Sequence, residues 1–178
     1  RARAQIKELE AAAGSIEDFY YSLRMQALVT PFEEAQLPRI AQLIGKTNQF
    51  NLTTRRHGMP QLTAFIRSSD YVHLALRLRD RYTDHGLVSV MIARCDGEVL
   101  DIDTWLMSCR VIGRTVEATM LEHLCRHAAQ LGCTVLQGTY IPTQKNAMAA
   151  EVYAKHGFEP FNQVKEQHLR RYDLKARG

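Results

Sequence analysis

The residues best placed to do chemistry lie in a strand–turn–helix pattern at positions 99–131. An apolar run reaches Cys109, Arg110 follows it, and Gly113 opens an amphipathic helix. Backbone N–H groups at a helix start are free to bind an anion, and a glycine lets the backbone approach a phosphate closely. The pattern therefore predicts a cradle for a phosphorylated carrier, such as coenzyme A or a phosphopantetheine arm.

Cys109 directly precedes this cradle, and two interpretations of it stay open. The helix start and Arg110 would favour its thiolate, a nucleophile that accepts an acyl group and passes it to a pantetheine thiol. A cysteine at the end of a strand is also typical of a small buried hydrophobic residue.

A sheet and its helices must position the cradle. Hydrophobic periodicity predicts a strand, a helix, three antiparallel strands, a helix, a strand, a helix and one or two final strands. This order predicts an α/β fold with a mixed, mostly antiparallel central sheet flanked by helices. The predicted strands are 25–29, 71–82, 87–93, 99–109, 134–140 and 161–174; the main predicted helices are 33–45, 113–131 and 142–156, with a turn at 84–86.

Composition narrows the function classes. The chain has 178 residues, 46% hydrophobic and 24% charged, which is typical of one globular domain. The net charge of +4 is mild and basic residues alternate with acidic ones, so nucleic-acid binding is not favoured. No apolar run is long enough to span a membrane, and no secretory signal is visible, so we expect a cytoplasmic protein.

The sequence does not favour a metal site. None of the four cysteines forms a C-x-x-C pair, and they are typical of reduced thiols. His123 and His127 are four residues apart on a predicted helix, but Cys125 between them faces another side, so they lack a third ligand.

The cradle resembles the Q/R-x-x-G-x-G/A motif of GNAT-family acyltransferases, which wraps the pyrophosphate of coenzyme A. Asn146 and Tyr153 fall on positions where that family carries a cofactor-contacting asparagine and a tyrosine that protonates the departing thiolate. Packing on the sheet is the alternative role for Tyr153. The resemblance implies that Tyr153 is catalytic, with Cys109 beside the cradle as the other catalytic candidate. It also implies that the cofactor is bound by Arg110, Val111, Ile112, Gly113, Arg114, Thr115 and Asn146. Thr115 departs from the family's small residue.

Four segments resemble the C-terminal part of FkbH-like proteins, which couple a haloacid-dehalogenase-type phosphatase domain to a GNAT-like domain. They are RIAQLIGKTNQFNLTTRR (39–56), DRYTDHGLVSV (80–90), DTWLMSCRVIGR (103–114) and YIPTQKN (140–146). The resemblance implies a transfer of a three-carbon glyceryl unit to the phosphopantetheine thiol of an acyl-carrier protein in polyketide-type biosynthesis. Residues 1–22 are then a linker or helical segment from an upstream phosphatase domain, and 23–178 form the GNAT-like acyltransferase domain.

The polar loop at 46–60 is a candidate substrate site. Its amides, hydroxyls and basic residues suit the hydroxyls, carbonyl and phosphate of a glyceryl donor, although a solvated loop is the alternative. The candidate substrate-binding residues are Asn48, Asn51, Thr53, Thr54 and Arg55.

Asp101-Ile-Asp103-Thr104 partly matches the phosphatase nucleophile motif. Its threonine comes one position early, and the pair falls inside a predicted strand, so we interpret both aspartates as strand residues.

Two other functions stay open. The domain is a non-catalytic docking module for the carrier protein if all chemistry belongs to the phosphatase domain. It is an acetyl-CoA-dependent N-acetyltransferase if the polar loop serves another purpose.

Overall fold

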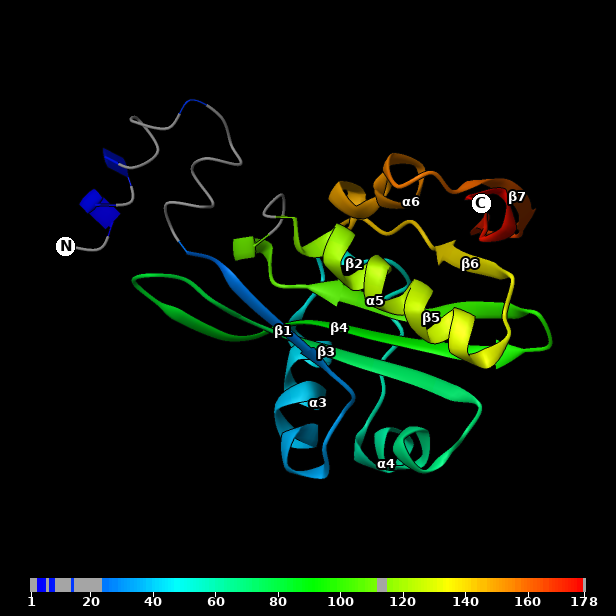
Figure 1. Cartoon of the computed structure of the whole chain (residues 1–178), viewed down its shortest axis with the longest axis horizontal. Helices are drawn as coiled ribbons and strands as arrows, with labels where there is room; N and C mark the ends of the chain where they lie inside the picture. The colour runs from blue at the N-terminus through cyan, green and yellow to red at the C-terminus, as the bar shows by residue number, and fades with distance from the viewer. Residues whose placement is uncertain (1–2, 6, 9–13, 15–23, 112–114, 178) are drawn as a thin grey trace.

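The computed structural model describes residues 3–5, 7–8, 14, 24–111 and 115–177. A twisted sheet crosses this part of the chain, with helices on both of its faces (Figure 1). None of the helices in the described ranges has the length and apolar character needed to cross a bilayer.

The sheet confirms the predicted mixed, mostly antiparallel topology. Its strand order is β1-β3-β4-β5-β6-β8-β7, and β2 pairs separately with β5. The β5–β6 pair is parallel, whereas the other strand pairs between described residues are antiparallel. The strands are β1 (Gln26–Thr30), β2 (Phe50–Asn51), β3 (Tyr71–Arg79), β4 (Asp84–Asp96), β5 (Val99–Met107), β6 (Val135–Tyr140), β7 (Glu159–Val164) and β8 (Gln167–Asp173).

Two hydrophobic cores lie on opposite faces of the sheet, each covered by helices. Helices α3 (Leu37–Lys46) and α4 (Met59–Arg67) pack on one face of the sheet, around Ile40, Ile44 and Leu62. Helix α5 (Val116–Leu131) packs on the other face with residues such as Met120 and Leu124. The short helix α6 (Val152–Lys155) contributes to the same core and lies above α5 in the view of Figure 1. Short 3₁₀ turns lie at Glu34–Gln36, Cys109–Val111, Ala147–Ala149 and Lys175–Arg177.

Several predicted boundaries were wrong. The turn expected at 84–86 belongs to β4, because Gly86 has a φ of +67° and absorbs a register shift while the ladder continues. The strand expected to reach Cys109 ends at Met107, and the helix expected over 142–156 is a 3₁₀ turn followed by α6.

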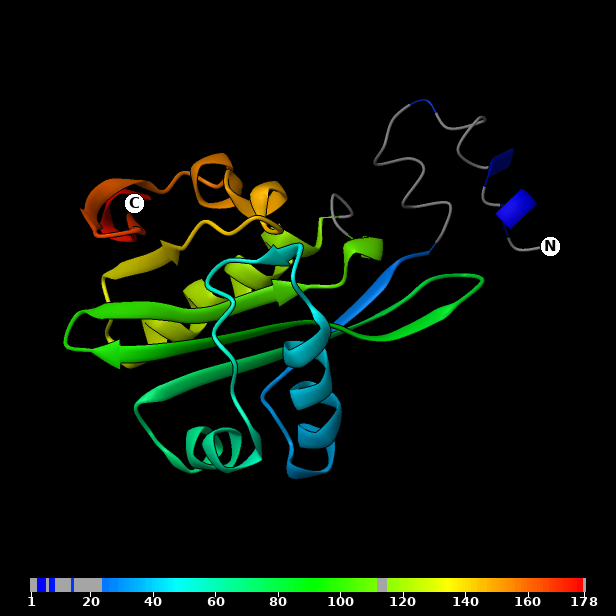
Figure 2. The same cartoon turned by 180° about the vertical axis from the view of Figure 1, so that it is seen from behind.

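The sheet opens between β5 and β6. The two strands pair from Val99–Val135 to Ile102–Gly138, and we call the opening beyond the latter pair the fork. The chain fills the fork with its own segment 50–52: Phe50 pairs with Met107, and Leu52 N–H donates to Trp105 O at 3.1 Å. On the other side, Ile141 N–H donates to Leu52 O at 2.8 Å, so this segment joins β5 to the chain that leaves β6 (Figure 2).

Candidate active site

Tyr153 lies at the vertex of the fork. Its ring packs against Gly138 of β6. A Cβ added to this glycine would lie only 2.3 Å from Tyr153 Cζ, so position 138 has no room for a side chain. The ring centroid lies 5.0 Å from that of Phe158 and 5.8 Å from that of Trp105. Tyr153 is 1% exposed, and burial raises the pKa of its phenol far above the usual value.

Two buried donors at the fork have no hydrogen-bond partner within the described part of the chain. They are Tyr153 Oη and Trp105 Nε1, in rings that contact each other. An unpaired buried polar group costs about 1–3 kcal/mol, so folded proteins rarely keep one without a structural or functional reason. Burial keeps this phenol protonated, so it can donate a hydrogen bond, and its packing on β6 also fits the structural alternative. The role of Tyr153 as a proton donor stays a prediction.

A basic cleft of about 900 Å³ opens beside the ends of β2 and β5. Its charged lining consists of Arg39, Lys46, Arg110 and Lys145, all exposed, and none of its described lining residues is acidic. The other lining residues are Leu43, Thr47, Asn48, Gln49, Phe50, Met107, Ser108, Cys109 and Gln144. Four cations around one hollow suit a phosphorylated ligand.

Cys109 is exposed on the wall of the basic cleft. Its interpretation as a buried hydrophobic residue was therefore wrong, because β5 ends two residues earlier and the 3₁₀ turn carries the thiol outward. Its role as an acyl relay stays a prediction.

The predicted cradle is only partly described. Arg110 lines the cleft and donates from Nε to Ser108 Oγ at 3.2 Å, whereas Val111 is fully buried and turns its side chain into the core. Ile112, Gly113 and Arg114 lie outside the described residues. Thr115 adopts a left-handed φ of +66° at the start of α5, a conformation that glycine adopts far more easily than a β-branched residue.

The predicted substrate residues separate into two groups. Asn48 lines the basic cleft, where its Oδ1 accepts a hydrogen bond from Arg56. Asn51, Thr53, Thr54 and Arg55 lie in the segment that fills the fork and continues past it. Asn51 is fully buried and holds this segment together, because its Nδ2 donates to Thr47 O at 3.1 Å and its Oδ1 accepts from Thr54 N–H at 3.0 Å.

Asn146 anchors the loop after β6 to the same segment. It is fully buried, and its Nδ2 donates to Asn51 O at 2.9 Å and to Ile141 O at 3.0 Å. Its Oδ1 accepts from Thr143 N–H at 2.8 Å and from Tyr140 Oη at 3.2 Å. The structure thus gives Asn146 a positioning role, and its contact with a cofactor stays a prediction.

One polar cluster escaped the sequence prediction. We call Arg55, His57, Asp103 and Thr104 the Asp103 cluster. Arg55 donates to Asp103 Oδ1 at 2.9 Å, His57 Nε2 lies 2.9 Å from Oδ2, and Thr104 Oγ1 donates to Oδ2 at 2.7 Å.

The cluster depends on a β-bulge. Ile92 of β4 pairs with Thr104 and Ala93 pairs with Ile102, so Asp103 has no partner across the ladder. The extra residue re-aims its side chain toward the loop that carries Arg55 and His57. A bulge leaves little trace in a strand's sequence; the Asp-x-Asp-Thr run was the only signal, and it correctly indicated strand residues.

The two aspartates of β5 differ in their electrostatics. Burial acts to raise the pKa of Asp103, but hydrogen bonds from His57 and Thr104 and the charge of Arg55 outweigh it, so that pKa lies below the usual value. Burial dominates at Asp101 and raises its pKa, despite a hydrogen bond from Gln137 Nε2 at 3.2 Å.

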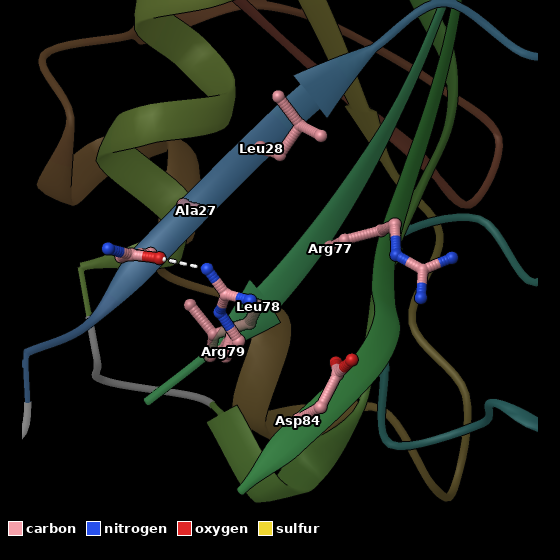
Figure 3. A pocket seen from close by; sticks show the side chains of 7 residues that line it. Ala27, Leu28, Arg77, Leu78, Arg79 and Asp84 are labelled. Atoms are coloured by element: carbon pink, nitrogen blue, oxygen red, sulfur yellow. Dashed lines mark hydrogen bonds between the residues drawn. The ribbon is translucent and has the colours of Figure 1, made fainter. Parts of the chain in front are cut away.

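A separate hollow lies between β1 and the start of β4, and it shares no lining residue with the basic cleft (Figure 3). Arg79 donates across it to Gln26 Oε1 at 2.6 Å, the dashed line in the figure. No residue that the sequence singled out for chemistry lines this hollow. Among the described residues, no three His, Cys, Asp or Glu side chains are grouped to hold a metal ion.

Solved structures show which fold this is. The GNAT domain of S. lividans PAT matches with a TM-score of 0.66 at 16% identity, covering 83% of this chain and 90% of that one. The Escherichia coli ribosomal-protein-S18-alanine N-acetyltransferase matches with a TM-score of 0.62 at 12% identity, covering 84% and 94%. The PaiA N-acetyltransferase from Thermoplasma acidophilum, solved in complex with coenzyme A, matches with a TM-score of 0.58 at 10% identity, covering 83% and 99%.

The chain therefore has the GNAT fold, as its motifs predicted. No family model matches the sequence, and no curated protein matches it in sequence. The identities to the solved structures are low, so these likenesses define the fold, and the chemistry must be argued from the site.

Proposed function

We propose that this domain is an acyltransferase that uses a phosphopantetheine thiol, loading a three-carbon glyceryl unit onto an acyl-carrier protein as FkbH-like proteins do. The observation that carries the proposal is the basic cleft with the exposed Cys109 on its wall. The sequence resemblance supports the glyceryl unit, the carrier protein and an upstream phosphatase domain as partners.

The residues present suit a phosphopantetheine group. Arg39, Lys46, Arg110 and Lys145 would hold its phosphate, because four cations face one hollow without an opposing carboxylate among the described lining residues. The unpaired Tyr153 Oη would donate a hydrogen bond or a proton at the fork. When bound, the pantetheine group supplies the thiol whose sulfur carries the acyl unit.

The proposal has two versions, which differ in whether Cys109 carries the acyl unit during the transfer. As a relay, its thiolate attacks the donor's acyl carbon and expels the donor's leaving group, which leaves the acyl unit on Sγ. The carrier's thiol then takes the acyl unit and frees Cys109. Without a relay, the acyl unit passes directly from donor to carrier.

The test mixes this domain and the phosphatase domain with holo-acyl-carrier protein and a glyceryl phosphate donor, and measures the carrier by intact mass. The proposal expects the carrier to gain the mass of one glyceryl unit, and expects Lys46→Glu with Lys145→Glu to abolish the gain. Unchanged loading by Cys109→Ala, with Cys125→Ala as the matched control, removes the relay and leaves direct transfer. No loading by the wild-type protein contradicts the proposal.

A second function is an acetyl-CoA-dependent N-acetyltransferase. The observation that favours it is that two structural neighbours are N-acetyltransferases and one of them binds coenzyme A. Calorimetry with acetyl-CoA separates the two functions. Tight binding of the free cofactor supports N-acetylation, whereas weak binding together with carrier loading supports the glyceryl reaction.

A further inference from the structure

Two cysteines lie in contact at the end of the molecule where β4 turns into β5. Cys95 Sγ and Cys133 Sγ are 3.3 Å apart, and both sulfurs lie within 4 Å of Gly97 O, at 3.8 and 3.9 Å. Neither residue belongs to the basic cleft, the fork or the Asp103 cluster.

Backbone contacts from separate elements hold the two residues in place. On β4, Cys95 pairs with Leu100 across the hairpin, and its N–H donates to Asp70 O at 2.7 Å. After α5, Cys133 N–H donates to Ala128 O at 2.9 Å. Thr134 N–H donates to Glu98 O at 2.8 Å and ties the segment after α5 to the hairpin turn. These contacts hold the backbones of both cysteines next to the same hairpin turn.

We propose that Cys95 and Cys133 form a site of reversible covalent modification, at which exchange with a low-molecular-weight disulfide closes an intrachain disulfide. The thiolate of Cys95 attacks the external disulfide, forms a mixed disulfide and releases one small thiol. Cys133 then attacks Cys95 Sγ, forms the intrachain bond and releases the second small thiol. One disulfide and two thiols stand on each side of the exchange.

Exposure sets the order of these two steps. Cys95 is partly exposed, whereas Cys133 is 4% exposed and out of reach of an external reagent. Burial raises the pKa of Cys133 to about 11, so this thiol is rarely ionised and does not start the exchange. Its contact with Cys95 Sγ places it to attack the mixed disulfide in the second step. A disulfide needs the sulfurs to approach from 3.3 Å to about 2.05 Å.

The disulfide would close the part of the chain that carries β5, Cys109, Arg110 and α5. Because the ends of this segment are already in contact, closure restricts the unfolded chain more than it changes the folded one. The oxidised protein is therefore expected to melt about 5–10 °C higher than the reduced protein.

The experiment equilibrates the reduced protein with glutathione buffers of rising oxidised fraction. Samples are quenched in acid, alkylated in denaturant and measured by intact mass. The proposal expects the number of alkylated thiols to fall from four to two, and peptide mapping to find the unmodified pair at Cys95 and Cys133. The Cys109→Ser/Cys125→Ser variant should fall from two to none over the same range of buffers.

Two single variants separate the steps. Cys133→Ser should stop at a mixed disulfide of glutathione on Cys95, and Cys95→Ser should leave Cys133 unmodified in the folded protein. The proposal is overturned if four thiols are alkylated at every glutathione ratio, or if the lost thiols map to Cys109 or Cys125. These outcomes do not depend on the acyl-transfer activity.

Discussion

Two polar groups lie next to each other along β5, and they are satisfied in opposite ways. In the Asp103 cluster, both carboxylate oxygens have partners, from Arg55, His57 and Thr104. Two residues further along β5, Trp105 Nε1 is buried beside Tyr153 Oη from α6, and neither atom has a partner among the residues that the structure describes. The Asp103 cluster, which we call the brace, links β5 to the loop that carries Arg55 and His57. The second group has two donors that could bind a ligand.

The contrast teaches that burial alone does not identify a catalytic group. Asn146 and Asn51 are as buried as Tyr153, yet their amide groups are engaged with the surrounding backbone. The unpaired donor at the fork is the feature that points to a ligand. The contrast also yields four predictions, from the largest expected effect to the smallest.

Tyr153→Phe should lower the activity strongly and leave the stability unchanged. We expect carrier loading to fall by about 10²-fold or more, because a general acid contributes that much, while unfolding in urea shows no loss of stability since no hydrogen bond is removed. The loading rate and the urea midpoint measure the two effects. Unchanged loading would make Tyr153 a packing residue, like Phe158 beside it, because the phenylalanine ring keeps the same contacts.

Gly138→Ala should break the fork itself. The new Cβ would overlap the Tyr153 ring, so we expect a loss of about 3 kcal/mol in the free energy of unfolding. Gly45→Ala is the matched control: Gly45 lies in α3 with open space around its Cα, and this change should be neutral or stabilising by up to about 1 kcal/mol. Equal effects of the two variants would contradict the packing of Tyr153 on Gly138.

Asp103→Asn should weaken the brace. We expect a loss of about 2 kcal/mol in the free energy of unfolding, because hydrogen bonds to a charged carboxylate are replaced by weaker ones and Arg55 loses its counter-ion. Asp101→Asn on the same strand should cost less, since burial already favours the neutral form of Asp101. Guanidinium unfolding of both variants measures the difference, and a larger loss for Asp101→Asn would reverse our assignment of the brace.

The pH dependence of stability should show the smallest of the four effects. The pKa of Asp103 is lower in the folded protein than in the unfolded chain, so its stabilisation is present above the unfolded carboxyl pKa and is lost as the pH falls through the folded value. Urea midpoints between neutral and acidic pH should therefore fall less steeply for Asp103→Asn than for the wild type. Parallel curves for the two proteins would show that the contacts of ionised Asp103 with His57 and Arg55 do not stabilise the folded protein.

Local pattern was enough to predict most of the elements. The strand predicted at 71–82, the apolar run into β5 and the helix predicted at 113–131 each overlap an observed element, because these signals depend on near neighbours in the chain. The strand and helix order then limited the topology to a mixed sheet, and the cradle motif indicated the GNAT fold.

Only the tertiary structure decided how the site is built. Asn51 and Asn146 are 95 positions apart, and Arg55 and Asp103 are 48 apart, so no local pattern links either pair. Strand register placed the bulge at Asp103, the end of β5 before Cys109 and the close approach of Tyr153 to Gly138. A one-residue shift in register exchanges the two faces of a strand, so these contacts depend on packing across the whole sheet, which the order of residues along the chain does not reveal.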